Sequence, residues 1–230
     1  MQSKIVLLGD YNPQYHTHLT LDEAIKHLTH SVNQEVTVEW QTTDKFDYSN
    51  AFTSDYSGLW IAPGSPYKDM ENVLNTIRYA REHQIPTIGN CGGFQHMIIE
   101  FARNVCGIVN ADTEETNPDA TDIVISKLSC SLVGQSEEIS ILKNSFLHSL
   151  IGKSQLTGKY HCSYALNENY IPVLESHGMK MTAWNQEGNI RAFELIKHPF
   201  FVGTLFQPAL TSTSYEPDPL LLSFVNRVRS

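Results

Sequence analysis

Short apolar runs alternate with longer amphipathic segments through the first 105 residues. This order is typical of βαβ units, in which parallel strands form one sheet beneath covering helices. It predicts strands at 5–8, 35–40, 58–62 and 85–88 and helices at 21–32, 69–83 and 93–105, the first helix being capped by Thr20. We therefore expect an α/β protein with a central, mostly parallel sheet flanked by helices.

From about residue 120 the pattern changes to shorter segments separated by turns. Antiparallel strands are predicted at 123–128, 138–142 and 158–166, further strands at 179–184, 190–196 and 201–206, and helices at 170–177 and 218–228. An antiparallel section is thus added to the parallel sheet. Because no repeat, low-complexity stretch or Pro/Gly/Ser linker interrupts the sequence, we expect a single domain over residues 1–230.

The charge balance limits the partners that the chain can bind. Lys and Arg total 16 against 25 Asp and Glu, a formal net charge of −9. An acidic surface repels phosphate backbones and anionic lipids, so neither nucleic acid nor a membrane is an expected partner. The apolar run at 5–8 is too short for a signal peptide, and no run reaches the roughly 20 residues that span a bilayer. We expect a cytoplasmic protein.

Cysteines and histidines are scattered rather than clustered. Four cysteines stand at 91, 106, 130 and 162 without C-x-x-C spacing, so each is either a core thiol or a working thiolate. The ten histidines show no H-E-x-x-H spacing, and no metal site is expected. Nothing in the composition indicates a bound cofactor.

The segment Gly89-Asn90-Cys91-Gly92-Gly93 lies where a predicted strand turns into a helix. Its G-x-C-x-G spacing is the cysteine version of a nucleophile elbow, in which small neighbours permit a strained turn that projects the nucleophile from the sheet. The N-terminus of the following helix favours the thiolate, and the Gly92 amide points toward an oxyanion on a substrate carbonyl. The alternative is a buried cysteine in a glycine-rich turn.

A second oxyanion donor is predicted in Pro63-Gly64-Ser65-Pro66-Tyr67, which follows the strand at 58–62. The carboxyl ends of neighbouring parallel strands meet at one edge of a sheet, so Gly64 is expected near Cys91. The alternative is an ordinary tight turn.

These two motifs, in this order, resemble the class I glutamine amidotransferases, and more closely the glutaminase domain of CTP synthase. The resemblance covers nearly the whole chain. It also rests on Arg78-Tyr79-Ala80-Arg81-Glu82, Glu100-Phe101-Ala102-Arg103-Asn104-Val105, Asn110 to Glu115, Tyr164 to Asn167, His198 to Val202, and Phe206-Gln207-Pro208-Ala209-Leu210-Thr211-Ser212-Thr213. The family implies a flavodoxin-like α/β fold. It also implies that Cys91 is the nucleophile, that Gly64 and Gly92 are the oxyanion donors, and that Gln95 and Glu115 hold glutamine.

Three positions depart from the family pattern. Gln207 and Ala209 stand where the family has the histidine and glutamate of its catalytic triad, and Ser163 stands where it has a substrate-binding arginine. Glutamine does not take a proton from a thiol at neutral pH, and alanine does not orient an imidazole. Small stand-alone homologues that this chain resembles carry C-G-G-F-Q-H and F-Q-P at the corresponding positions.

Other histidines are therefore candidates for the general base. His161, beside Ser163, ranks first, and His18, predicted in the loop after the first strand, ranks second. His96 is expected to be buried between helix and sheet. We assign Cys91, His161 and Gln207 to catalysis, with Gln207 hydrogen-bonding an intermediate or substrate amide, and Gln95, Glu115 and Ser163 to substrate binding.

Two functions follow from these residues. The first is a stand-alone cysteine amidohydrolase or amidotransferase that acts on a small, glutamine-like amide or γ-glutamyl carbonyl. The second is a non-catalytic metabolite-binding or regulatory module. A homodimer or a partner synthase is compatible with either, and 230 residues are expected to leave no room for the ATP-using domain of a complete CTP synthase.

Overall fold

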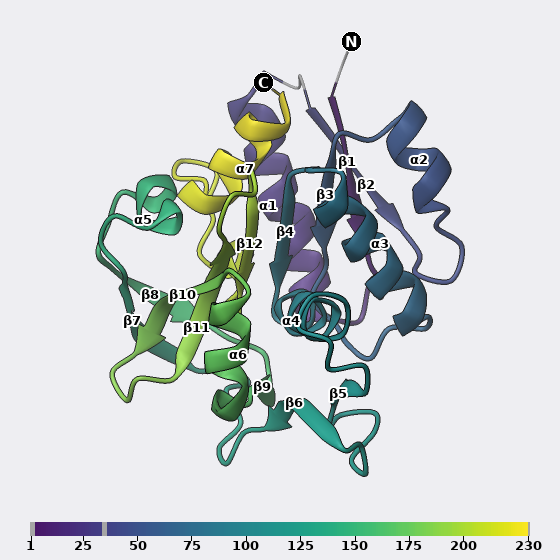
Figure 1. Ribbon diagram of the computed structural model, residues 1–230. Helices are drawn as coiled ribbons and strands as arrows, with labels where there is room; N and C mark the ends of the chain where they lie inside the picture. The colour runs from purple at the N-terminus through teal and green to yellow at the C-terminus, as the bar shows by residue number, and fades with distance from the viewer. Residues whose placement is uncertain (1–2, 34–35, 230) are drawn as a thin grey trace.

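The computed structural model describes residues 3–33 and 36–229 (Figure 1). Within these residues, nine strands form one sheet in the order β2-β1-β3-β4-β12-β11-β10-β7-β8. The strands are β1 (Ser3–Leu8), β2 (Val36–Gln41), β3 (Gly58–Ile61), β4 (Thr87–Asn90), β12 (Phe201–Thr204), β11 (Ile190–Leu195), β10 (Met179–Asn185), β7 (Ser136–Ile141) and β8 (Gln155–Lys159). The first five in this order run parallel, and the other four continue the sheet antiparallel. Both predicted parts of the sheet are confirmed.

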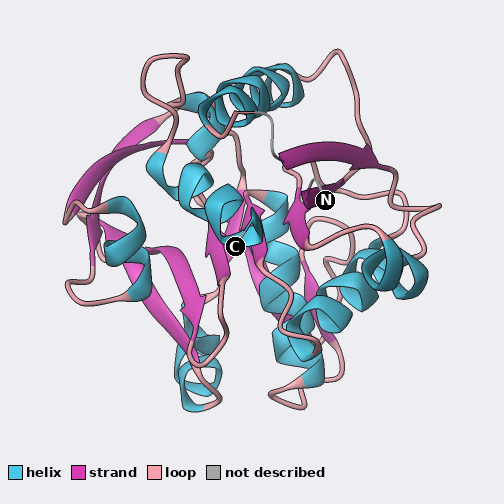
Figure 2. Cartoon of the chain, turned by 90° about the horizontal axis from the view of Figure 1, so that it is seen from above, coloured by secondary structure: helices cyan, strands magenta, loops and turns pink. Residues whose placement is uncertain are grey.

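Helices cover both faces of the parallel strands, as Figure 2 shows from above. The helices are α1 (His16–Ser31), α2 (Tyr48–Ser54), α3 (Met70–Glu82), α4 (Gly92–Asn104), α5 (Phe146–Ile151), α6 (Ile171–Ser176) and α7 (Pro219–Arg229), with short 3₁₀ turns η1 (Glu168–Tyr170) and η2 (Pro208–Leu210). Helices α3 and α4 pack together on one face, and α1 and α7 pack together on the other.

A smaller sheet packs against α4. It contains β5 (Ala111–Thr113), β6 (Asp122–Lys127) and β9 (Tyr164–Leu166), and all three strands contact α4. Because α4 lies between this sheet, α3 and the large sheet, its first eleven residues are all buried. No helix of the described residues is long and apolar enough to cross a membrane.

The strand order explains where a site must form. Strands β2-β1-β3-β4 with β12 reproduce the flavodoxin-like order 2-1-3-4-5, the fifth strand arriving from near the end of the chain. Strands β3, β4 and β12 are buried along their whole length and end at the same edge. The loops that follow them are thereby brought together.

The structure differs from the sequence prediction at several elements. The predicted strand 158–166 is two strands, β8 and β9, in different sheets, because residues 160–163 cross from one sheet to the other. Helix α1 begins at His16 rather than after Thr20, whose hydroxyl donates to the His16 carbonyl inside the helix. Helices α2 and α5 and strand β5 were not predicted, since each is only three to seven residues long. Glu35, the first residue of the predicted second strand, lies outside the described residues.

Candidate active site

Cys91 is the single residue between β4 and α4, and its backbone is strained. Its φ of 53° and ψ of −107° are unusual for a residue with a side chain. The two nearby glycines are required by close packing: a Cβ on Gly93 would lie 2.5 Å from the Ile61 carbonyl oxygen, and one on Gly89 would lie 2.5 Å from the Met97 sulfur. The predicted sharp turn from strand to helix is present.

Buried polar side chains hold this turn to its neighbouring strands. The Trp60 indole N–H donates to Asn90 Oδ1, and Asn90 Nδ2 donates to Thr204 Oγ1, both at 2.8 Å. The Thr204 carbonyl also accepts the Cys91 N–H at 2.9 Å. Asn90 and Cys91 are therefore tied to β3 and β12, so the turn has little freedom to relax.

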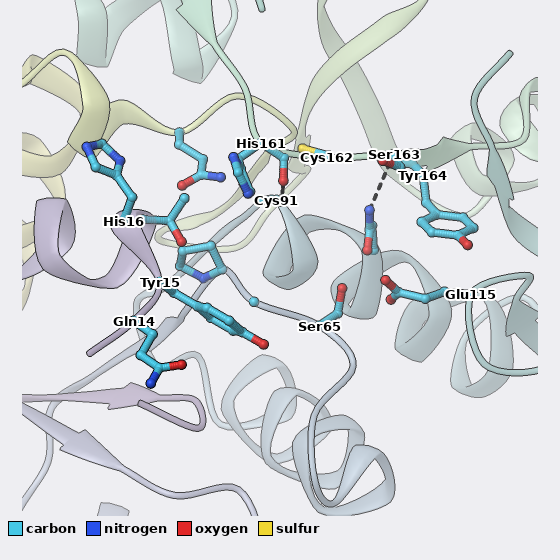
Figure 3. Close-up of a pocket in the computed structure, with 15 residues that line it drawn as sticks. Gln14, Tyr15, His16, Ser65, Cys91, Glu115, His161, Cys162, Ser163 and Tyr164 are labelled. Atoms are coloured by element: carbon cyan, nitrogen blue, oxygen red, sulfur yellow. Dashed lines mark hydrogen bonds between the residues drawn. The ribbon is translucent and has the colours of Figure 1, made fainter. Parts of the chain in front are cut away.

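The Cys91 sulfur faces the segment that crosses between the two sheets. Its thiol donates to the His161 carbonyl oxygen at 3.6 Å (Figure 3). Cys162 lies beside it, is itself buried, and donates to the Leu205 carbonyl at 3.3 Å. Contact with the Cys91 sulfur and burial raise the pKa of Cys162 well above the ordinary value. Cys162 is buried as expected for a core thiol, but it also lines the cavity, which the sequence prediction missed.

The loop after β3 approaches the start of α4 closely, as predicted for the two oxyanion donors. Gly64 has a φ of +108°, a conformation that favours glycine. A Cβ on Gly92 would lie 3.1 Å from the Ser65 backbone nitrogen. The backbone of this loop and the first turn of α4 are thus adjacent, next to Cys91.

His18 holds this loop from the other side and is not placed as a base. It lies in the first turn of α1, not in a loop, and is 1% exposed. The Asn12 N–H donates to Nδ1 at 3.0 Å, so Nε2 carries the proton and donates to the Pro63 carbonyl at 2.9 Å. Burial lowers the pKa of His18. Both ring nitrogens serve the backbone, which overturns the second-ranked candidate for a general base.

His96 is buried, as expected, at 2% exposure. Its Nδ1 lies 2.8 Å from the Gly92 carbonyl oxygen, and its ring packs edge-on against Tyr67. Burial lowers the pKa of His96 to about 4. It supports the first turn of α4 rather than facing the cavity.

A cavity of about 440 Å³ opens beside Cys91. Its lining includes seven of the predicted site residues: Gly64, Cys91, Gln95, Glu115, His161, Ser163 and Gln207. Gly92, the eighth, is not in the lining but lies close to the Ser65 backbone, which is. The lining also contains Gln14 to Thr17, Pro63, Ser65, Cys162 and Tyr164, which the sequence analysis did not assign. Residues 14–17 directly follow the loop after the first strand, and this position in the sequence could have indicated that they line the cavity.

Three buried polar atoms in the lining have no hydrogen-bond partner among the described residues: Gln95 Oε1, Glu115 Oε2 and Gln207 Nε2. The Gln95 amide is held in place because its Nε2 donates to the Tyr164 carbonyl at 2.8 Å. Burial raises the pKa of Glu115, and the Ser65 hydroxyl beside it acts in the opposite direction. Buried polar groups are nearly always paired in folded proteins, so these are the atoms of the lining that remain free to pair with water or a ligand.

The Ser163 side chain has a hydrogen-bond partner among the described residues, whereas the Gln207 amide nitrogen has none. The Ser163 hydroxyl is paired with that of Ser131 at 2.9 Å, and its side chain carries no charge. Gln207 is 3% exposed, its backbone N–H donates to the Lys159 carbonyl, and it is part of the cavity lining. Among the described residues, no group of three or more His, Cys, Asp and Glu side chains is arranged to hold a metal ion.

Comparison with known proteins agrees with this geometry. The family model "Glutamine amidotransferase class-I" matches residues 17–227. The chain belongs to the class I glutamine amidotransferase family. Two CTP synthases, from Archaeoglobus fulgidus and Saccharolobus solfataricus, are each 30% identical to this amidotransferase domain over 97% and 98% of it. The domain spans less than half the length of these relatives, 44% and 45%.

Solved structures show the same fold. The glutaminase domain of Trypanosoma brucei CTPS with bound acivicin superposes with a TM-score of 0.87 and 21% identity, covering 98% of this amidotransferase domain and 93% of that chain. A glutamine amidotransferase from Thermotoga maritima superposes with a TM-score of 0.62 at 10% identity, covering 100% of this domain and 99% of that chain. The predicted fold class and family resemblance are confirmed.

Proposed function

We propose that this class I glutamine amidotransferase domain is a cysteine-dependent amidohydrolase. The observation that supports the proposal best is the strained Cys91, held by close-packed glycines at the mouth of a cavity that contains unpaired buried polar atoms. Such strain persists only where the surrounding structure enforces it, and it is common at nucleophiles. Removing the Cys91 side chain tests whether the cavity carries out this chemistry.

In the proposed reaction the Cys91 sulfur attacks the carbonyl carbon of an amide. The backbone N–H groups of Gly64 and Gly92 stabilise the resulting oxyanion. The thiol proton passes to the leaving nitrogen, ammonia departs, and an acyl thioester remains on Cys91. Water then hydrolyses the thioester to a carboxylic acid and restores the thiol. The Gln207 amide, buried and unpaired, donates to the intermediate.

His161 is the proposed general base because it lines the same cavity as Cys91. Figure 3 shows the two residues side by side, joined through the His161 carbonyl. The residue is exposed to solvent. The histidine and glutamate of the family triad are replaced by Gln207 and Ala209 in this proposal, so the base comes from the crossing segment 160–163 instead.

Ammonia release is expected to depend on Cys91. Wild-type protein should release ammonia from a glutamine-type amide, and Cys91→Ala should reduce the rate to background, because the other thiol in the lining, Cys162, is buried and its pKa is raised. Cys130→Ala is the matched control, since Cys130 is exposed and does not line the cavity. An enzyme-linked ammonia assay gives both rates. Equal rates for wild type and Cys91→Ala would contradict the proposal.

Alkylation by iodoacetamide at neutral pH should distinguish the four cysteines. Cys91 is expected to react faster than the exposed Cys130, because the dipole of α4 attracts negative charge and the cavity admits the reagent. Cys106 and Cys162 should react slowly, since burial raises the pKa of Cys106 to about 11 and the pKa of Cys162 is raised well above the ordinary value. Peptide mass spectrometry measures each rate.

The same measurement tests the assignment of the base. His161→Gln should slow the alkylation of Cys91 while leaving that of Cys130 unchanged. A Cys91 rate no faster than that of Cys130 in the wild type would show that the thiol is not activated, and an unchanged rate in His161→Gln would remove His161 from the proposal.

A second function, a non-catalytic binding module, is favoured by two observations. The Cys91 thiol is engaged as a donor to the His161 carbonyl, and the residue at position 207 is an amide. In this case a glutamine-like ligand would stabilise the wild type and Cys91→Ser equally, with no ammonia released by either. Either function fits one domain over residues 1–230 that works with a partner synthase or as a homodimer in the cytoplasm.

A further inference from the structure

The charge of the cavity lining indicates what kind of ligand it accepts. Among the described residues that line it there is neither lysine nor arginine, and Glu115 is the only carboxylate. Its basic groups are the imidazoles of His16 and His161. Figure 3 shows His16 and Glu115 at opposite ends of the cavity, with Ser65 nearer to Glu115. The end that contains Glu115 therefore favours a cation, and the described lining offers a carboxylate no lysine or arginine as a partner.

Two unpaired acceptors define this end more closely. Gln95 is 2% exposed, and its amide orientation is set because Nε2 donates to the Tyr164 carbonyl, which leaves Oε1 as an acceptor. Glu115 Oε2 is a second buried acceptor without a partner among the described residues. An ammonium group carries three N–H donors and is the simplest ligand group that satisfies both acceptors and neutralises the carboxylate.

The neighbouring wall gives an α-carboxylate no charged partner among the described residues. The Ser163 hydroxyl, next to Tyr164 in the lining, is neutral and shares one hydrogen bond with the Ser131 hydroxyl, in which either oxygen can be the donor. A carboxylate moved from water into this region would lose hydration without gaining a charged partner, which is costly. A neutral amide in its place avoids that cost. The cavity volume of about 440 Å³ lies in the range of pockets for ligands larger than a single amino acid.

We propose that this domain prefers glutamine whose amine is free and whose α-carboxyl is already in an amide bond, as at the N-terminus of a peptide. The ammonium binds Gln95 Oε1 and Glu115 Oε2, the side-chain amide reaches Cys91, and the following peptide unit extends past Ser163. This inference rests on the proposed function for the reacting amide. The recognition of the ammonium and the masked carboxyl rests on the cavity alone.

Binding and turnover are measured separately, so that the ligand preference and the proposed amidohydrolase function can each be rejected independently of the other. Thermal stabilisation and calorimetry with Cys91→Ala, at about pH 8 where an ordinary imidazole is neutral, compare four probes: glutamine, glutaminamide, the dipeptide Gln-Gly and N-acetylglutaminamide. Glutaminamide and Gln-Gly should each bind at least about tenfold more tightly than glutamine. N-acetylglutaminamide, which lacks the ammonium, should bind at least about tenfold more weakly than glutaminamide.

Three variants identify the groups responsible. Glu115→Gln should abolish the discrimination against N-acetylglutaminamide, whereas Glu114→Gln, which removes the same charge from a neighbour that is outside the lining and accepts from the Lys127 N–H, should leave it unchanged. Ser163→Arg should shift the preference toward free glutamine. Glutamine binding as tightly as the two amidated probes, or none of the amine-bearing probes binding, would overturn the inference. Preferential binding without ammonia release from wild type would instead reject only the proposed function.

Discussion

Ammonia release from glutamine-type amides should rise about 10²- to 10⁴-fold when Gln207→His and Ala209→Glu are introduced together, the usual contribution of a positioned general base. Gln207 lines the same cavity as Cys91 and is 3% exposed, so an imidazole at this position is expected to reach the Cys91 sulfur. A carboxylate at position 209, two residues further along η2, is expected to orient that imidazole, as the family resemblance implies. The double variant therefore tests whether the scaffold still positions a base.

The single variants and a nucleophile deletion serve as controls. Gln207→His alone should give a smaller increase, because the imidazole lacks an orienting partner, and Ala209→Glu alone should give none. Adding Cys91→Ala should remove the gain entirely. Circular dichroism must show that each variant is folded, since Ala209 is 7% exposed and a carboxylate there is partly desolvated. A folded double variant with no increase would show that position 207 does not reach the reacting thiol.

Arg81→Ala should destabilise the fold by about 3–5 kcal/mol, the usual cost of leaving a buried charge without its partner. Arg81 on α3 and Glu100 on α4 form an ion pair with an N–O distance of 2.8 Å, and the Glu100 side chain is fully buried. The pair joins two segments that carry the family resemblance and connects α3 to α4, the helix that follows Cys91. Urea unfolding measures the loss.

Helix α3 also contains an exposed ion pair, which serves as a matched control. Arg78 pairs with Glu82 at 2.9 Å, with both side chains about half exposed, so Arg78→Ala should cost no more than about 1 kcal/mol. Replacing both buried charges, as Arg81→Ala with Glu100→Leu, should recover much of the loss. Equal effects of Arg78→Ala and Arg81→Ala would contradict the assignment of a buried pair.

The loss of folding stability in Arg81→Ala should also depend on pH in a defined direction. Burial raises the pKa of Glu100, and the Arg81 guanidinium opposes that rise. Without Arg81, the folded protein favours the protonated carboxyl more strongly than the unfolded chain does. The deficit of Arg81→Ala is therefore largest above the folded pKa of Glu100 and shrinks as the pH falls through it. A deficit that grows on acidification would contradict the buried carboxylate as its cause.

Local patterns were sufficient to predict most of the elements and the elbow. Apolar runs such as 5–8 and amphipathic stretches such as 69–83 have periodicities that strands and helices require, and the structure has strands or helices at both. The spacing of Gly89 and Gly93 around Cys91 predicted the strained turn because the two close approaches there tolerate no Cβ. Short elements such as α2 and β5 carry too few residues for a period to be recognised.

Contacts between distant segments were not predictable in this way. His18 has the residue type of a base, yet Asn12 and Pro63 engage both its ring nitrogens, and only the packing of α1 against the loop after β3 reveals it. From the sequence, Cys162 was expected to be a core thiol. The crossing of residues 160–163 between the two sheets places it beside Cys91.

The sequence by itself determined the α/β pattern, the strand-to-helix cysteine and the family, because each depends on residues that are close together or in a recognisable order. Tertiary structure alone decided which side chains share the cavity, that its Glu115 end lacks a cation, and that His18 serves the backbone. Those features arise where β3, β4 and β12 end at one sheet edge and gather segments more than 100 residues apart. Alternating apolar and amphipathic segments thus predict the sheet, but the chemistry at its edge depends on how the loops pack against one another.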